Sequence, residues 1–172
     1  MSVSADQAQH LRDIIARDRG EPPALSLVRP QTGRMRIMAI TSGKGGVGKS
    51  SIAVNLSILL ARATRDVVLL DADMGTANAD LLCNLQPDDN LAHVIAGRKT
   101  LVDVMLEAPG GFRLIAGASG LANMAALSRR EHDRLLEEMY LLEHVADTLV
   151  IDTGAGIGPN VLGFIGGAHQ QV

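Results

Sequence analysis

A glycine-rich turn with two lysines constrains most strongly what this chain can fold into. The segment Gly43-Lys44-Gly45-Gly46-Val47-Gly48-Lys49-Ser50 fits the phosphate-binding pattern Gly-x4-Gly-Lys-Ser/Thr. A short apolar run, Ile37–Thr41, precedes it and predicts a buried parallel strand. Apolar residues at helical spacing follow it and predict a helix over Gly48–Ala63. Strand, turn and helix therefore occur in the order that places backbone N–H groups and a helix N-terminus around a phosphate.

The side chains of the turn have expected roles toward a nucleoside triphosphate. The glycines let the backbone approach an oxyanion, and Lys49 would contact the β- and γ-phosphates. The Ser50 hydroxyl would bind a Mg²⁺ ion. The expected nucleotide-binding residues are Gly43, Lys44, Gly45, Gly46, Val47, Gly48, Lys49, Ser50 and Ser51. The turn therefore predicts a nucleoside triphosphate site.

The same glycines also fit a rival pattern, the Gly-x-Gly-x-x-Gly fingerprint of dinucleotide-binding proteins. Asp71 closes the next apolar strand at roughly the distance where a ribose-binding acid is expected. Two features count against this nicotinamide-dependent oxidoreductase hypothesis. Lys49-Ser50 directly follows the last glycine, and a second acid, Asp73, follows Asp71. We therefore favour the phosphate loop of a nucleoside triphosphatase.

The rest of the chain alternates between apolar runs and amphipathic segments. Strands are expected at Ile37–Thr41, Val67–Leu70, Phe112–Ala116 and Thr148–Ile151, and helices at Gly48–Ala63, Leu91–Ile95, Leu101–Glu107 and Arg129–His144. Ser128 and Glu131 form a capping box before the last helix. This alternation predicts an α/β fold of the P-loop NTPase type, with a doubly wound, mostly parallel sheet and helices on both faces.

Acidic residues follow two of the predicted strands, at the edge where parallel sheets bind ligands. Asp71 and Asp152 end strands beside the glycine turn, and Mg²⁺ takes few carboxylates in such sites. Asp73 lies two residues further on, where it can orient a water near the γ-phosphate. A strand-end Asp is more often a helix cap or turn residue, but two such acids beside a phosphate loop favour the metal role. The predicted metal-binding side chains are Ser50, Asp71 and Asp152.

Three segments are expected along the chain. Residues 1–20 predict an amphipathic helix, residues 21–34 a proline-containing linker, and residues 35–172 the main domain. Ser4 and Gln7 have capping-box spacing at the start of this helix. Such a helix either docks on its own domain or binds a partner protein, and the apolar pattern leaves both interpretations open.

Composition excludes several function classes. A net charge of −3 over 172 residues argues against a nucleic-acid-binding surface. The single cysteine, Cys83, can form neither an internal disulfide nor the cysteine set of an iron–sulfur cluster, so a reducing cytoplasm is expected. No apolar stretch approaches the ~20 residues of a membrane span. These features predict a cytoplasmic protein without direct nucleic-acid binding.

The glycine turn resembles the deviant Walker A loop of the MinD/ParA ATPases. Within that family, Leu70–Asp80 and Ile151–Ile157 look most like the flagellar number regulators of the FlhG group, also called FleN or YlxH. The resemblance implies ATP and Mg²⁺ as cofactors, slow hydrolysis, an ATP-dependent homodimer and a role in flagellar placement or number. A MinD-like division-site or ParA-like partition ATPase is the alternative within the family.

Further residue roles follow from this resemblance. The first lysine of the loop, here Lys44, reaches across the dimer to the partner's phosphates in these proteins. Lys44, Lys49 and Asp73 are therefore the expected catalytic residues.

The amino-terminal helix resembles the segment by which FlhG proteins stimulate the signal-recognition-type GTPase FlhF. The expected partner-binding residues are Asp6, Gln7, Ala8, Leu11 and Arg12. Flagellar C-ring proteins or a flagellar transcription regulator are further implied partners. A nucleotide-independent interaction protein, which binds FlhF through this helix alone, is a third hypothesis.

Two features depart from the family pattern. Thr76 stands where these proteins more often have a large apolar residue. The sequence ends at Val172, so the later strands and the carboxyl-terminal amphipathic membrane helix have no counterpart in it. The domain is therefore expected to be incomplete at its carboxyl terminus, and peripheral attachment to the inner face of the cell membrane is expected only of a full-length protein.

Overall fold

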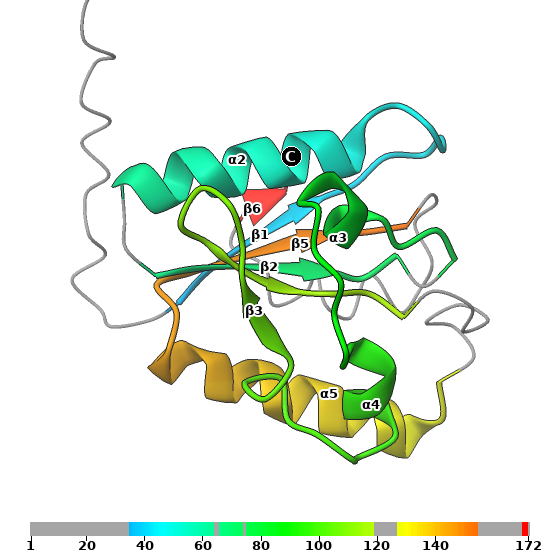
Figure 1. Cartoon of the computed structure of the whole chain (residues 1–172). Helices are drawn as coiled ribbons and strands as arrows, with labels where there is room; N and C mark the ends of the chain where they lie inside the picture. The colour runs from blue at the N-terminus through cyan, green and yellow to red at the C-terminus, as the bar shows by residue number, and fades with distance from the viewer. Residues whose placement is uncertain (1–34, 64–65, 74, 119–126, 155–169, 172) are drawn as a thin grey trace, which may run out of the picture.

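A six-stranded sheet forms the centre of the molecule (Figure 1). The computed structural model describes residues 35–63, 66–73, 75–118, 127–154 and 170–171. In chain order the elements are β1 (Arg36–Ile40), α2 (Lys49–Ala63), β2 (Val67–Asp71), α3 (Ala79–Leu82), α4 (Leu91–Ile95), β3 (Met105–Glu107), β4 (Arg113–Ile115), α5 (Arg129–Leu141), the 3-10 helix η2 (Leu142–His144), β5 (Thr148–Asp152) and β6 (Gln170–Gln171). The helix and linker predicted over residues 1–34 lie outside the described residues.

The strand order is β3-β4-β2-β5-β1-β6. All neighbouring pairs are parallel except β3 and β4, which are antiparallel. The α2 and α3 helices cover one face of the sheet, and α4 and α5 cover the other (Figure 1). The predicted α/β fold with a mostly parallel sheet and helices on both faces is confirmed.

Alternation along β2 shows how the core is divided between the two layers. All five residues of this strand are buried. Val67 and Leu69 pack into the core under α2 and α3, whereas Val68 and Leu70 pack into the core over α4 and α5. A strand buried on both faces needs apolar residues at successive positions, which explains the continuous apolar run in the sequence. The free Cys83 is buried in the first of these cores.

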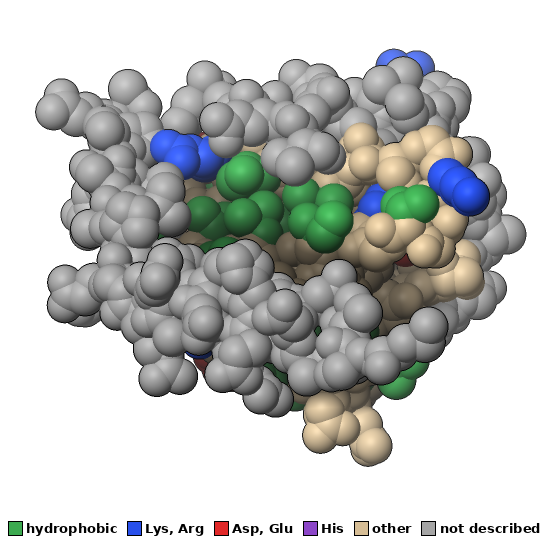
Figure 2. Space-filling model, turned by 90° about the horizontal axis from the view of Figure 1, so that it is seen from above, with side chains coloured by type: hydrophobic (Ala, Val, Ile, Leu, Met, Phe, Trp, Pro, Cys, Tyr) green, Lys and Arg blue, Asp and Glu red, His purple; other side chains and the backbone are tan. Residues whose placement is uncertain are grey.

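The α2 helix carries large apolar side chains on its outer side as well as on its inner side. Ala53 and Val54 face the sheet and are buried, whereas Ile52 and Leu59 are 52% and 59% exposed. Figure 2, which views the molecule from the α2 side, shows the exposed apolar side chains. In the described part of the chain, no helix is long and apolar enough to cross a membrane.

The capping box predicted before α5 is present. The Ser128 Oγ accepts a hydrogen bond from the Glu131 N–H at 3.3 Å, and the Ser128 N–H donates to the Glu131 carboxylate at 2.8 Å. These reciprocal bonds satisfy backbone donors that the first helical turn leaves unpaired. The helix continues as η2, so the two elements together cover the predicted range of residues 129–144.

The helix predicted over Leu101–Glu107 is wrong. Turns occupy residues 101–104, and Met105–Glu107 form β3, which pairs antiparallel with β4. Leu101 and Val104 are both buried. Their three-residue spacing is also typical of the apolar face of a helix, which explains the wrong prediction. The glycine pair Gly110-Gly111, with φ angles of 100° and 89°, closes a hairpin at this point. The turn at Gly110-Gly111 therefore favours a β-hairpin here, although the apolar spacing of residues 101–107 favours a helix.

Candidate phosphate-binding site

The glycine turn leads from β1 into the N-terminus of α2. Gly46 and Gly48 have φ angles of 72° and 93°, a region that residues with side chains rarely adopt. The Ser42 hydroxyl donates a hydrogen bond to the Lys44 carbonyl oxygen at 2.7 Å within the turn. The 15 residues of α2 follow, with no acidic residue in the first turn. The positive end of the helix dipole is therefore available to a phosphate at this turn.

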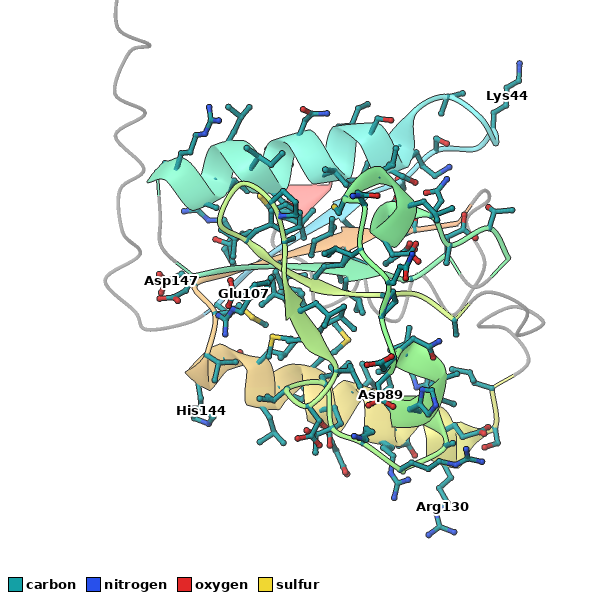
Figure 3. All side chains as sticks on the ribbon, viewed as in Figure 1. Lys44, Asp89, Glu107, Arg130, His144 and Asp147 are labelled. Atoms are coloured by element: carbon teal, nitrogen blue, oxygen red, sulfur yellow. The ribbon has the colours of Figure 1, made fainter. Side chains whose placement is uncertain are left out.

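The two lysines of the turn have different environments. Lys49 is the first residue of α2 and is buried, with 8% of its surface exposed. Lys44 is exposed, and its side chain points away from the body of the molecule (Figure 3). The buried Lys49 suits contact with the phosphates of a nucleotide bound to the same chain. The exposed Lys44 suits contact with a second molecule. Both roles remain predictions.

The predicted strand-end acids lie side by side. Asp71 and Asp152 are paired in register at the ends of β2 and β5, and each is 1% exposed. The Thr153 hydroxyl and N–H both donate to the Ile40 carbonyl oxygen at the end of β1, at 2.9 and 3.2 Å. The carboxyl ends of β1, β2 and β5 therefore meet at one edge, as the sequence predicted.

Asp152 has the properties of a ligand to a hard cation. Neither of its carboxylate oxygens accepts a hydrogen bond of normal geometry from the described residues, although both are buried. Burial raises the pKa of this carboxyl group, and the nearby Ser50 hydroxyl and Lys49 ammonium act in the opposite direction. A buried carboxylate without a partner is costly, and a divalent cation would satisfy its oxygens. Ser50 and Asp152 therefore fit a Mg²⁺ ion.

Asp71 is held differently, because its carboxylate already has donors. Its Oδ1 accepts from the Asp73 N–H at 3.0 Å, and its Oδ2 accepts from the N–H groups of Asn78 and Ala79, both at 3.1 Å. Burial raises the pKa of Asp71 to about 6, although these N–H groups favour the charged form. Asp71 thus fixes both ends of the β2–α3 loop (residues 72–78). Its proposed contact with a metal remains a prediction.

Asp73 is bound by its own loop. Its Oδ1 accepts from the N–H groups of Gly75 and Thr76 at 3.1 and 3.0 Å, and its Oδ2 accepts from the Thr76 hydroxyl at 2.9 Å. A Cβ built on Gly154, just beyond β5, would lie 3.3 Å from Oδ1 of Asp73. The carboxylate therefore lies close to the loop that follows Asp152. The structure brings Asp73 near the strand-end acids, and its role toward a water remains a prediction.

Sequence reasoning did not predict the contacts of two residues of this region, Thr76 and Gly117. A Cβ at Gly117 would lie 2.7 Å from the Ala77 Cβ and 2.9 Å from the Asp71 carbonyl oxygen, so only glycine fits there without a shift. Thr76 was noted only as a departure from the family pattern, and its contact with Asp73 was not predicted. The position of Gly117 just beyond β4, at the same sheet edge, was a signal that could have identified it.

A separate hollow of about 450 Å³ lies on α5. The residues that line it are Arg129, Arg130, Asp133, Arg134 and Glu137. None of the predicted site residues is among them. The predicted partner-binding residues, Asp6 to Arg12, lie outside the described residues.

The chain is similar in sequence to proteins of known family. The pattern of the CobQ/CobB/MinD/ParA nucleotide binding domain matches residues 38–165. The antiactivator FleN of Pseudomonas aeruginosa is 46% identical over 136 residues, which are 79% of this chain and 49% of FleN. The flagellum site-determining protein YlxH of Helicobacter pylori is 38% identical over 134 residues, which are 77% of this chain and 45% of YlxH. The chain thus spans about half the length of the curated relatives it matches.

The fold is also similar to solved structures. The septum site-determining protein MinD from Pyrococcus horikoshii, complexed with Mg-ADP, superposes with a TM-score of 0.67 at 27% identity. The match covers 80% of this chain and 56% of that structure. The sequence match, the parallel sheet and the glycine turn before α2 all agree, and the chain belongs to the CobQ/CobB/MinD/ParA family of nucleotide-binding domains.

Proposed function

We propose that this chain is an ATP-binding, slowly hydrolysing dimerisation switch that regulates flagellar placement or number. The observation that supports it most is the buried Lys49 at the glycine turn, near a buried Asp152 carboxylate that accepts no hydrogen bond of normal geometry from the described residues. The flagellar role is supported by the similarity to FleN and YlxH.

Each residue of the site has a separate proposed role. Lys49 and the N-terminus of α2 would bind the phosphates, and Ser50 with Asp152 would hold the metal. A bound Mg²⁺ ion would neutralise part of the charge on the phosphate oxygens. Asp71 keeps the β2–α3 loop in place, and Asp73 orients the attacking water. The Mg-ADP complex of the similar MinD supports magnesium as the metal.

Lys44 is proposed to act only in the dimer, so its removal should separate dimerisation from binding. We expect Lys44→Ala to bind ATP within about twofold of the parent but to remain monomeric at ATP concentrations that dimerise the parent. Sedimentation velocity with ATP and with ADP measures this. Arg62→Ala is the matched control, because it removes an exposed positive charge from the far end of α2. Equal dimerisation of parent and Lys44→Ala would refute the deviant-loop role.

The amino-terminal helix is proposed to activate FlhF. We expect a peptide of residues 2–20 to raise the GTP hydrolysis rate of purified FlhF at least about tenfold, since a positioned side chain typically contributes 10²–10⁴-fold to such reactions. A peptide with Gln7→Ala and Leu11→Ala is the control, because it lacks the proposed positioning amide and an apolar contact. No stimulation by the parent peptide, or equal stimulation by both, would favour a segment that docks on its own domain.

A MinD-like role in cell division is the second candidate, supported by the fold match to MinD. Expression of the chain in a motile bacterium that lacks its own flagellar regulator distinguishes the two. Correction of flagellar number supports the flagellar role, whereas an effect on septum position alone supports the division role. We also propose that the chain contacts C-ring proteins or a flagellar transcription regulator when it acts in the flagellar role.

A further inference from the structure

The Thr76 side chain makes a contact that no other described residue of the β2–α3 loop provides. Both backbone donors to Asp73, the N–H groups of Gly75 and Thr76, would be present whatever side chain stood at position 76, proline excepted. They bind Oδ1 of Asp73. The Thr76 hydroxyl donates to the other oxygen, Oδ2, at 2.9 Å. Among the described residues of this loop, Thr76 is therefore the only one whose side chain donates a hydrogen bond to Asp73.

We propose that Thr76 is a positioning residue that slows ATP hydrolysis by taking one acceptor position of Oδ2 and restricting the orientation of the Asp73 carboxylate. The inference rests on the proposed function, in which Asp73 orients the attacking water. A carboxylate oxygen accepts about two hydrogen bonds. Oδ1 already has two, so a nucleophilic water must use Oδ2, where the Thr76 hydroxyl takes one acceptor position and fixes the carboxylate plane. One acceptor position on Oδ2 is therefore left for that water, and the bond to Thr76 restricts the direction in which this position points.

The loop does not depend on this hydroxyl for its place. Asp71 holds the loop at Asp73 at one end and at Asn78 and Ala79 at the other, through backbone N–H groups. Thr76 itself is exposed, and a hydrogen bond between exposed groups contributes little to stability. Removal of the hydroxyl should therefore leave the fold and the nucleotide site intact. It should change only the range of orientations that the Asp73 carboxylate can adopt.

The test compares Thr76→Val, which keeps the β-branched shape but removes the donor, with Thr76→Ser, which keeps the hydroxyl. We expect Thr76→Val to raise kcat for ATP about threefold, the effect of one modest hydrogen bond, with KM unchanged. Thr76→Ser should behave like the parent. Steady-state phosphate release measures both. An unchanged or lower kcat in Thr76→Val would overturn the inference.

Two further variants separate this inference from the proposed function. Asp73→Ala should lose turnover, and adding Thr76→Val to Asp73→Ala should give no increase, because the hydroxyl acts only through Asp73. Equal turnover in Asp73→Ala and the parent would refute the proposed function itself. If Asp73→Ala loses turnover while Thr76→Val matches the parent, only the role of Thr76 is refuted.

Discussion

Replacing Lys49 with alanine is expected to reduce ATP affinity at least about 100-fold. The lysine is 8% exposed at the first residue of α2, so a phosphate at this turn would lose a charge-assisted donor in a partly dehydrated site. A loss of about 2.7 kcal/mol corresponds to this factor. Equilibrium binding of a fluorescent ATP analogue measures it.

Two controls make the Lys49→Ala result specific. Circular dichroism shows whether the variant is folded, since Lys49 is buried. Lys44→Ala removes the other lysine of the same turn, and because that side chain is exposed it should bind ATP like the parent. If Lys49→Ala is folded and binds ATP as tightly as the parent, the glycine turn is not the phosphate site.

Replacing Asp73 with alanine is expected to lower ATP turnover at least about 100-fold while ATP binding changes little. General-base or water-orienting groups contribute about 10²–10⁴-fold to such reactions. Asp73 lies beside Gly154 near the strand-end acids, whereas Lys49 and the helix N-terminus supply the binding energy. The variant should therefore accumulate as an ATP-bound dimer. Single-turnover phosphate release and sedimentation velocity measure the two effects.

Asp80→Ala is the matched control for Asp73→Ala. Asp80 is an acid in the first turn of α3, a few residues further along the same segment, and has no proposed part in hydrolysis. It should turn over ATP like the parent. Equal loss of turnover in both variants would mean that the effect comes from the charge or folding of the segment. Undiminished turnover in Asp73→Ala would remove this carboxylate from the mechanism.

Much of the fold could be predicted because buried parallel strands leave a clear pattern. The apolar runs that form β1, β2, β4 and β5 were predicted to within one residue at each end. The glycine turn and the Ser128 capping box also depend on local chemistry, and both occur where predicted. The strand-end acids could be placed together because parallel strands share one carboxyl edge.

The short elements and the hydrogen bonds of the site depend on contacts that the apolar pattern of the sequence does not show. The β3 strand is three residues long, and its pairing with β4 depends on the glycine pair at 110–111. The α3 helix is a single turn, and β6 has two residues, both too short for a periodic signal. The separate hydrogen-bonding roles of Asp71 and Asp152 depend on which donors surround each carboxylate. Two acids at equivalent strand ends looked alike in the sequence.

Calorimetric titration of the purified chain with ATP, with Mg²⁺ and again with excess chelator, tests the central claim most directly. We expect one saturable site per chain, with clearly weaker binding in chelator, because the Asp152 carboxylate would then face the phosphates without a cation between them. A chain that is folded by circular dichroism but binds no ATP at millimolar concentration, with or without Mg²⁺, would contradict the proposed ATP site. That result would favour the nucleotide-independent interaction protein.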